Sequence, residues 1–185
     1  MAKPKILAFA GSTRKGSLNK KLIDIAAKMA SEQGGDVTLL DLDDYPLPLF
    51  NEDLEKEGTP ENAAKVKQLF LDHHGLLIAS PEYNSSITPD VKNTIDWVSR
   101  RAEGEPRLAA YQNKVALLLS ASPGALGGLR GLVHLRSILG NIGVLVMPEQ
   151  IAVPNGFEEL DGAQEENLKS MTGKLVSNLS RLQSE

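Results

Sequence analysis

Five short apolar runs alternate with amphipathic stretches along the chain, and this alternation predicts the fold. The runs are predicted strands at Ile6–Ala10, Val37–Leu42, Leu76–Ala79, Val115–Leu119 and Val144–Met147. Three of them are nearly continuous in apolar residues, as expected of strands that are covered on both faces. Strands that alternate with helices form a parallel sheet between two layers of helices. We therefore predict an α/β three-layer sandwich with a five-stranded parallel sheet.

Apolar residues between these runs recur at helical spacing. They predict helices that carry Leu18, Leu22, Ala26 and Met29, then Val91, Ile95 and Val98. The segment Leu126–Leu139 is apolar on most faces, which predicts a helix buried against more than the sheet. A heptad-like stripe in the last helix comprises Leu168, Met171, Leu175, Leu179 and Leu182. This stripe fits a coiled-coil seam or a single helix docked on the sheet, and we expect the docked helix.

The 185 residues show no repeat, low-complexity segment or linker, so we predict a single domain over residues 1–185. The longest irregular stretch, Asp43–Pro60, exceeds the usual length of a connection, and loops of this length tend to be functional or mobile. Ligands of open parallel sheets bind beyond the carboxyl ends of the strands. Three loops are therefore candidates for a site: Gly11–Asn19, Ser80–Pro89 and Ser120–Gly128.

Composition narrows the class of protein. Hydrophobic residues make up 41% and charged residues 24% of the chain, with a net charge of −4. This balance gives no indication of a nucleic-acid partner. The chain has no cysteine, which excludes disulfides and thiol catalysis, so redox chemistry would require a bound cofactor. No apolar run approaches the roughly 18 residues of a membrane span, and Ile6–Ala10 is too short for a signal peptide, so we expect a cytoplasmic protein without a membrane partner.

The first candidate loop, in the stretch AGSTRKGSLN, has the composition of an anion site. Its hydroxyl groups come from Ser12, Thr13 and Ser17, and Arg14 offers a planar fork for phosphate oxygens. It follows a strand and precedes a helix, whose N-terminus attracts anions. A simple turn with a helix cap is the competing interpretation. A nucleotide-triphosphate loop requires a lysine directly after the second glycine. Here Lys15 comes before that glycine, which speaks against NTP hydrolysis.

The other two loops suit a flat ring. Pro81–Asn84 combines a rigid backbone, an aromatic face and polar edges, although Tyr83 could simply be surface packing. The glycines of SASPGALGGLRG do not fit a dinucleotide fingerprint, but small residues let the backbone approach a ligand closely.

Remaining candidates for catalysis or metal binding are weak. We expect no catalytic or metal-binding role for the three histidines, of which two end a helix and His134 lies in the apolar segment Leu126–Leu139. The acidic run of Glu52, Asp53 and Glu55 is expected to be a solvated loop, because nothing imposes the geometry of a divalent-ion site. The sequence thus predicts no metal site and no catalytic side chain.

Two motifs together resemble the NAD(P)H-dependent FMN reductase family, which includes quinone, chromate and azo reductases. Residues 11–19, GSTRKGSLN, resemble its G-S-x-R-x-x-S-x-N signature. Residues 81–84, PEYN, followed by KNTIDW at residues 92–97, are similar to its second motif, and residues 122–128 are similar to its third loop. One departure is Thr88, which stands where many members have the proline that follows Ser-Ile. The resemblance therefore says less about the substrate than about the cofactor.

The resemblance implies a flavodoxin-like fold that binds FMN noncovalently. Position by position, it assigns FMN binding to Ser12, Arg14, Ser17, Leu18, Asn19, Pro81, Glu82, Tyr83, Asn84, Ser122 and Gly124. The phosphate would be surrounded by Ser12, Arg14, Ser17 and Asn19. Residues 81–84 would follow the edge of the isoalloxazine, and Ser122 and Gly124 would face the ring.

The resemblance also implies an activity. NADPH or NADH would pass two electrons through FMN to a small-molecule acceptor such as a quinone, a free flavin, an azo compound or chromate. We expect a homodimer or homotetramer, because the apolar helix at 126–139 lies beside the predicted site. The alternatives are a flavodoxin-like one-electron carrier and a phosphate-ester enzyme that uses the first loop.

Overall fold

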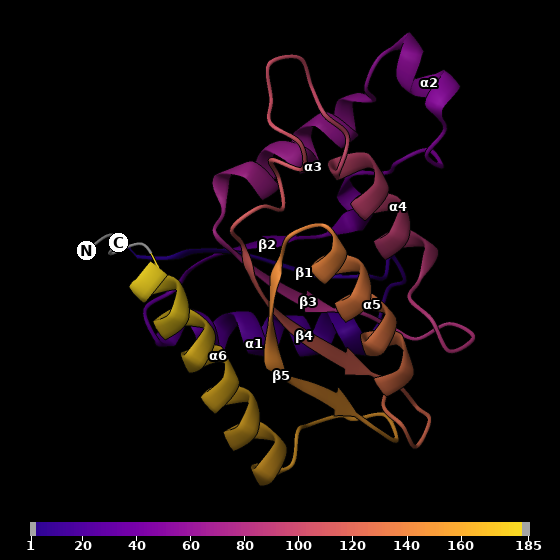
Figure 1. Cartoon of the computed structure of the whole chain (residues 1–185). Coiled ribbons are helices and arrows are strands. Elements are labelled where there is room, and N and C mark those ends of the chain that lie inside the picture. The colour runs from indigo at the N-terminus through magenta and orange to yellow at the C-terminus, as the bar shows by residue number, and fades with distance from the viewer. Residues whose placement is uncertain (1–2, 183–185) are drawn as a thin grey trace.

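The computed structural model describes residues 3–182 and contains one parallel sheet between two layers of helices (Figure 1). The strand order is β2-β1-β3-β4-β5. The strands are β1 (Lys5–Ala10), β2 (Asp36–Leu40), β3 (Gly75–Ala79), β4 (Val115–Ala121) and β5 (Leu145–Val153). The helices are α1 (Leu18–Glu32), η1 (Leu42–Asp44), α2 (Glu52–Glu57), α3 (Glu61–Asp72), α4 (Pro89–Val98), α5 (Leu129–Asn141) and α6 (Gly162–Leu182). The predicted five-stranded α/β sandwich is confirmed.

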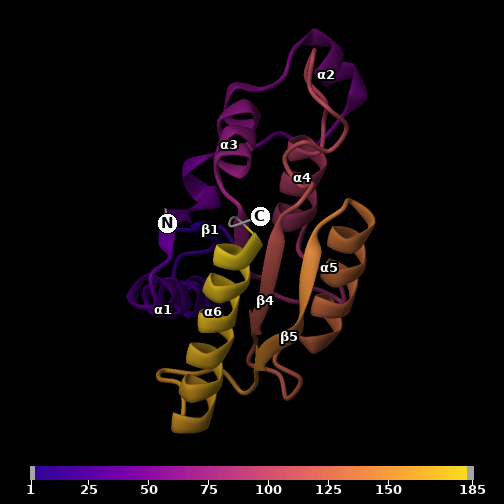
Figure 2. The same ribbon diagram turned by 60° about the vertical axis from the view of Figure 1, so that its left-hand side comes forward.

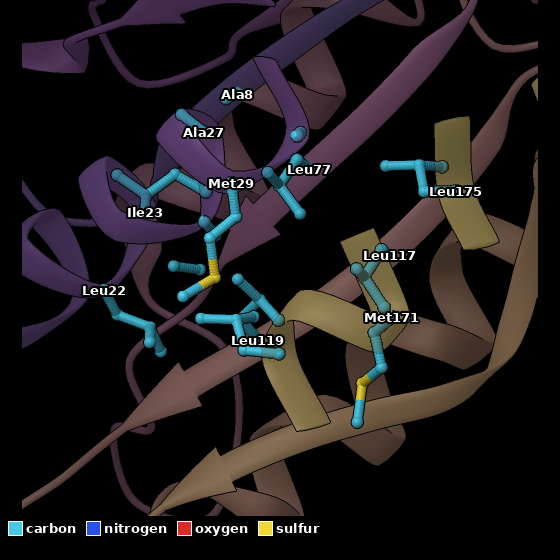
Figure 3. Close-up of a cluster of buried hydrophobic side chains, with 14 of the residues drawn as sticks. Ala8, Leu22, Ile23, Ala27, Met29, Leu77, Leu117, Leu119, Met171 and Leu175 are labelled. Atoms are coloured by element: carbon cyan, nitrogen blue, oxygen red, sulfur yellow. The ribbon is translucent and has the colours of Figure 1, made fainter. Parts of the chain in front are cut away.

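The sheet separates two apolar cores. Helices α1 and α6 cover one face, and α3, α4 and α5 cover the other (Figure 2). In the first core, Leu22 and Met29 of α1 meet Leu117 and Leu119 of β4 and Met171 of α6 (Figure 3). The central strands β1, β3 and β4 are almost wholly buried, which explains their continuous apolar runs.

Helix α6 docks on the sheet and on α1, as expected of a single amphipathic helix. Its stripe is buried at Leu168, Met171, Leu175 and Leu179, whereas Leu182 is half exposed. No helix within residues 3–182 is both long and apolar enough to cross a membrane.

Strand β5 extends further than its apolar run predicts. The run stops at Met147, but the strand continues through Pro148 to Val153. The register against β4 shifts between Ala116 and Leu118, so an irregularity accommodates the proline. Because β5 is an edge strand, Pro148 removes no essential hydrogen bond from the ladder.

Two expectations about helices are wrong. Asp43–Pro60 is not wholly irregular, because it contains η1 and the short α2, where Asn51 caps the helix by accepting from the N–H of Asp53. Helix α5 is buried on one face only. Leu126 just before it, and Leu129 and Val133 within it, are 51%, 42% and 57% exposed. His134 also lies on the exposed side, where its ring contacts the hydroxyl of Ser86.

Candidate functional site

The carboxyl ends of β1, β3 and β4 bring the three predicted loops together around a pocket of about 120 Å³. Its lining comprises Ser12, Arg14, Ser17, Leu18, Asn19, Pro81, Glu82, Tyr83, Ala121, Ser122 and Pro123. Nine of these residues were predicted as FMN contacts. Ala121 and Pro123 were missed, although both neighbour the predicted Ser122. The predicted Asn84 and Gly124 do not line the pocket.

The first loop presents free donors to this pocket. The hydroxyl of Ser12 accepts from the N–H of Arg14, and that of Ser17 accepts from the N–H of Asn19, so each hydroxyl can donate its own hydrogen to a ligand. Within residues 3–182, the backbone N–H groups of Thr13, Lys15 and Gly16 donate to no protein acceptor. Such N–H groups before a helix N-terminus form an anion site. The donor set of this loop therefore fits a phosphate.

Asn19 connects the first loop with the third. Its side-chain amide donates to the carbonyl oxygen of Ala121 at 2.8 Å and accepts from the N–H of the same residue at 2.9 Å. The residue is buried, and both hydrogen bonds lie within the floor of the pocket. Asn19 thus holds the end of β4 against the start of α1, and its contact with a phosphate stays a prediction.

Thr88 connects the first loop with the second. Its hydroxyl donates to the carbonyl oxygen of Gly11 at 2.7 Å and also accepts from the N–H of Val91, which caps α4. Gly11 leaves no room for a side chain here, because an added Cβ would lie 2.0 Å from Val91. Thr88, the residue that departs from the family pattern, therefore fixes the start of the first loop at Gly11.

The carboxylate of Glu82 binds residues of α5. It pairs with Arg130 at 2.6 Å and accepts from the N–H of Gly131 at 3.1 Å. Desolvation, the largest single influence, raises the pKa of Glu82, but the hydrogen bonds from Gly131 and Arg130 outweigh it, so this pKa lies below its ordinary value. Glu82 therefore stays ionised at neutral pH and positions the second loop instead of donating a proton.

A tight turn presents Tyr83 at the open side of the pocket. Tyr83 and Ser86 exchange two backbone hydrogen bonds, and the residues between them have positive φ angles, 49° at Asn84 and 66° at Ser85. This is the type I′ turn, in which asparagine is favoured. Tyr83 is 51% exposed, so its ring can meet a ligand.

Replacing Ser85 by glycine is expected to stabilise the fold by about 0.5–1 kcal/mol, because glycine adopts positive φ without steric cost. The free energy of unfolding in urea measures the effect. Asn84→Gly is the matched control and should change stability less, since asparagine tolerates this conformation. A destabilising effect of Ser85→Gly would contradict the turn described here.

The pocket fits the phosphate end of FMN better than the whole cofactor. Sites that enclose a drug-sized ligand measure roughly 300–1,000 Å³, so about 120 Å³ accommodates the phosphate and the chain next to it. The flavin ring would lie at the open side, near Tyr83. No cluster of three metal-binding side chains occurs in the described part of the chain.

Comparisons with known proteins agree with this geometry. Residues 4–158 match the model of the family described as NADPH-dependent FMN reductase. The chain is 37% identical over 135 residues, which is 72% of its length, to an NAD(P)H:quinone oxidoreductase of Solanum tuberosum, and it spans 66% of that protein. It is 30% identical over 175 residues, 94% of its length, to a quinone reductase of Escherichia coli, of which it spans 86%.

A solved structure matches over nearly the whole chain. The flavoenzyme FerB of Paracoccus denitrificans, an NAD(P)H:(acceptor) oxidoreductase, superposes with a TM-score of 0.80 at 27% identity. The match covers 96% of this chain and 98% of that one. The flavodoxin-like arrangement is thus shared over the full sheet.

Proposed function

Because the chain belongs to the family of NADPH-dependent FMN reductases, we propose that it is an enzyme that transfers two electrons from NAD(P)H to a small-molecule acceptor. The observation that carries this proposal is the donor-rich pocket at the carboxyl ends of β1, β3 and β4. FMN, when bound, supplies the chemistry by accepting a hydride and passing on its electrons. Quinones are the proposed acceptors, since two relatives are named for them; free flavins, azo compounds and chromate are further candidates.

The protein's own residues bind and orient in this proposal. The first loop holds the phosphate with its free N–H groups, with the hydroxyls of Ser12 and Ser17 and with Arg14. Tyr83 covers part of the ring, and Ser122 borders it from the third loop. Glu82 is the one carboxyl group among the described lining residues, and it is held ionised. No side chain is therefore assigned as a proton donor.

One experiment tests this proposal against an electron carrier and a phosphate-ester enzyme. The purified protein should show the visible absorption of an oxidised flavin. Anaerobic NADPH or NADH should then bleach that absorption without any partner protein, and a quinone should restore it. A colourless protein that does not bind added FMN would overturn the proposal. Flavin reduced only in the presence of a second protein would favour the one-electron carrier.

We also propose that the protein forms a homodimer or homotetramer through α5. The side chains of Leu126, Leu129 and Val133 are exposed at the start of α5, the helix that binds Glu82 of the pocket lining, and an apolar patch next to a site is typical of an interface. Sedimentation at micromolar concentration should show a species larger than 19.9 kDa. Val133→Glu should shift it toward the monomer, whereas Leu145→Glu, at an equally exposed position on β5, should not. A monomeric parent protein would contradict this proposal.

The cytoplasmic location stays a prediction.

A further inference from the structure

The second half of the family motif, KNTIDW at residues 92–97, lies outside the FMN pocket and holds a different segment. We call residues 45–50, between η1 and α2, the strap. The amide of Asn93 accepts from the N–H of Phe50 at 2.8 Å and donates to the carbonyl oxygen of Pro48 at 2.9 Å. The indole N–H of Trp97 donates to the same carbonyl at 2.8 Å. Three hydrogen bonds from α4 therefore fix a segment that has no helix or strand of its own (Figure 1).

Aromatic and charged contacts reinforce the strap. The rings of Phe50 and Trp97 meet edge to face, 5.0 Å apart. The guanidinium of Arg100 lies over the Phe50 ring at 5.1 Å and pairs with Glu55 of α2 at 2.7 Å. These contacts keep the strap in place independently of any ligand. The space beneath it is therefore preformed.

That space, the strap pocket, measures about 190 Å³ and is larger than the FMN pocket. It is lined by Thr13, Leu42, Tyr45, Pro46, Leu47, Asp90, Asn93 and Thr94. Thr13 separates it from the FMN pocket, which the flanking Ser12 and Arg14 line. The two pockets thus lie on either side of a single loop.

The lining indicates the chemistry of the ligand. Tyr45, Pro46 and Leu47 offer an aromatic ring and apolar surface to a flat group. Asp90 is half-buried, and its carboxylate makes no hydrogen bond or ion pair within residues 3–182. Lys92, two residues further along α4, is paired with Asp96 at 2.7 Å. Among the described residues, no cationic side chain lines the strap pocket, so a phosphate is disfavoured inside it.

A flat ring that carries hydroxyl groups meets these requirements. We propose that the strap pocket binds the adenosine end of the reduced dinucleotide, with Tyr45 against the adenine and Asp90 accepting hydrogen bonds from the ribose hydroxyls. A carboxylate that holds the ribose diol is the arrangement that dinucleotide-binding folds also use. The inference rests on the proposed function, because NAD(P)H is the donor there.

A consequence is donor selectivity. The 2′-phosphate of NADPH would lie beside the unpaired carboxylate of Asp90, and like charges at close range repel. NADH has a hydroxyl group at this position and suffers no repulsion. Asp90 therefore makes NADH the better of the two donors in this chain.

The kinetic test compares Asp90→Asn with Asp96→Asn in the FMN-loaded enzyme. Asp90→Asn should lower kcat/KM for NADH and raise it for NADPH, and the ratio of the two should change by about tenfold or more. Asp96→Asn removes a carboxylate from the same helix outside the pocket and should leave the ratio unchanged. Reduced nicotinamide mononucleotide lacks the adenosine, so its kcat/KM should be equal in the parent enzyme and Asp90→Asn. If Asp90→Asn lowers kcat/KM for this shortened donor as much as for NADH, the proposal is wrong.

A binding test needs no turnover. The chain has a single tryptophan, and its indole N–H holds the strap, so its NMR resonance reports on the pocket. Titration of the FMN-loaded protein with ADP-ribose should shift this resonance. Asp90→Asn and Tyr45→Ala should weaken the affinity, whereas Asp96→Asn and Tyr45→Phe should retain it.

The outcomes separate the two proposals. If the protein oxidises NADH but ADP-ribose does not shift the Trp97 indole resonance, the strap-pocket assignment is wrong and the proposed function still stands. A protein that oxidises neither NADH nor NADPH overturns both.

Discussion

Replacing Arg14 by alanine is expected to weaken FMN binding by about 10- to 150-fold, the effect of losing a charge-assisted hydrogen bond worth about 1.5–3 kcal/mol. Arg14 lines the FMN pocket, and its guanidinium can pair with the phosphate beside the free N–H groups of the loop. The FMN dissociation constant, measured from the flavin fluorescence, tests this.

Lys15→Ala is the matched control for Arg14→Ala. Both side chains are exposed neighbours, but Lys15 does not line the pocket. Lys15→Ala should lower the free energy of FMN binding by only a few tenths of a kcal/mol, because the attraction between Lys15 and the phosphate is screened by salt. Measurements at two salt concentrations separate the effects. Equal weakening by the two substitutions would show that Arg14 does not hold the phosphate, and no effect of either would place the phosphate elsewhere.

Replacing Lys114 by methionine is expected to stabilise the fold at pH 7 by about 1–2 kcal/mol. Burial, the main cause, lowers the pKa of Lys114 from 10.5 to about 8, against the opposing attraction of Asp72. A shift of this size disfavours the charged folded state by up to about 3 kcal/mol. Lys114→Met removes this penalty but also loses the hydrogen bond to the carbonyl oxygen of His73, which offsets about 1 kcal/mol of the stabilisation.

The pH dependence has a definite sign. Between pH 8 and pH 10.5 the unfolded chain binds a proton at Lys114 that the folded protein has released. Stability due to this residue therefore rises with pH across this window. The advantage of Lys114→Met over the parent protein should shrink as the pH rises from 8 to 10.5.

Free energies of unfolding in urea from pH 7 to pH 10 measure this difference. Lys28→Met, on the exposed side of α1, is the control and should show a constant small difference. An advantage of Lys114→Met that grows with pH would contradict the assignment. Burial, and after it the charge of Lys114, lowers the pKa of His74 below its ordinary value, so this ring is neutral in the folded parent protein over the pH range of the measurement.

The buried strands could be predicted from the sequence because continuous apolar runs are the direct signature of burial on both faces. The end of β5 could not, since proline breaks strands except at an edge, and edge position depends on the whole sheet. Helix α2 is short, and no residue of it is buried, so it lacks an apolar stripe. Its cap at Asn51 was the one local signal.

The site was predictable where chemistry is local. The hydroxyls and Arg14 of the first loop follow one another in the sequence, so their convergence required only a strand and a helix around them. The roles of Asn19, Glu82, Asn93 and Trp97 were not predictable, because their partners lie on distant segments: Ala121, Gly131 and Arg130, and the strap. A motif shows that these side chains belong together but does not show what they hold.

Pro148 has a consequence for how the molecule meets copies of itself in a crowded solution. The outer edge of a parallel sheet offers a row of unpaired N–H and C=O groups on which another extended chain can assemble. In β5 this row is interrupted, because Pro148 has no N–H and the guanidinium of Arg136 occupies the carbonyl oxygen of Met147 at 2.7 Å. The edge of β5 is therefore a poor template for fibril growth at Met147 and Pro148, and the interruption there protects the protein from aggregation at this edge.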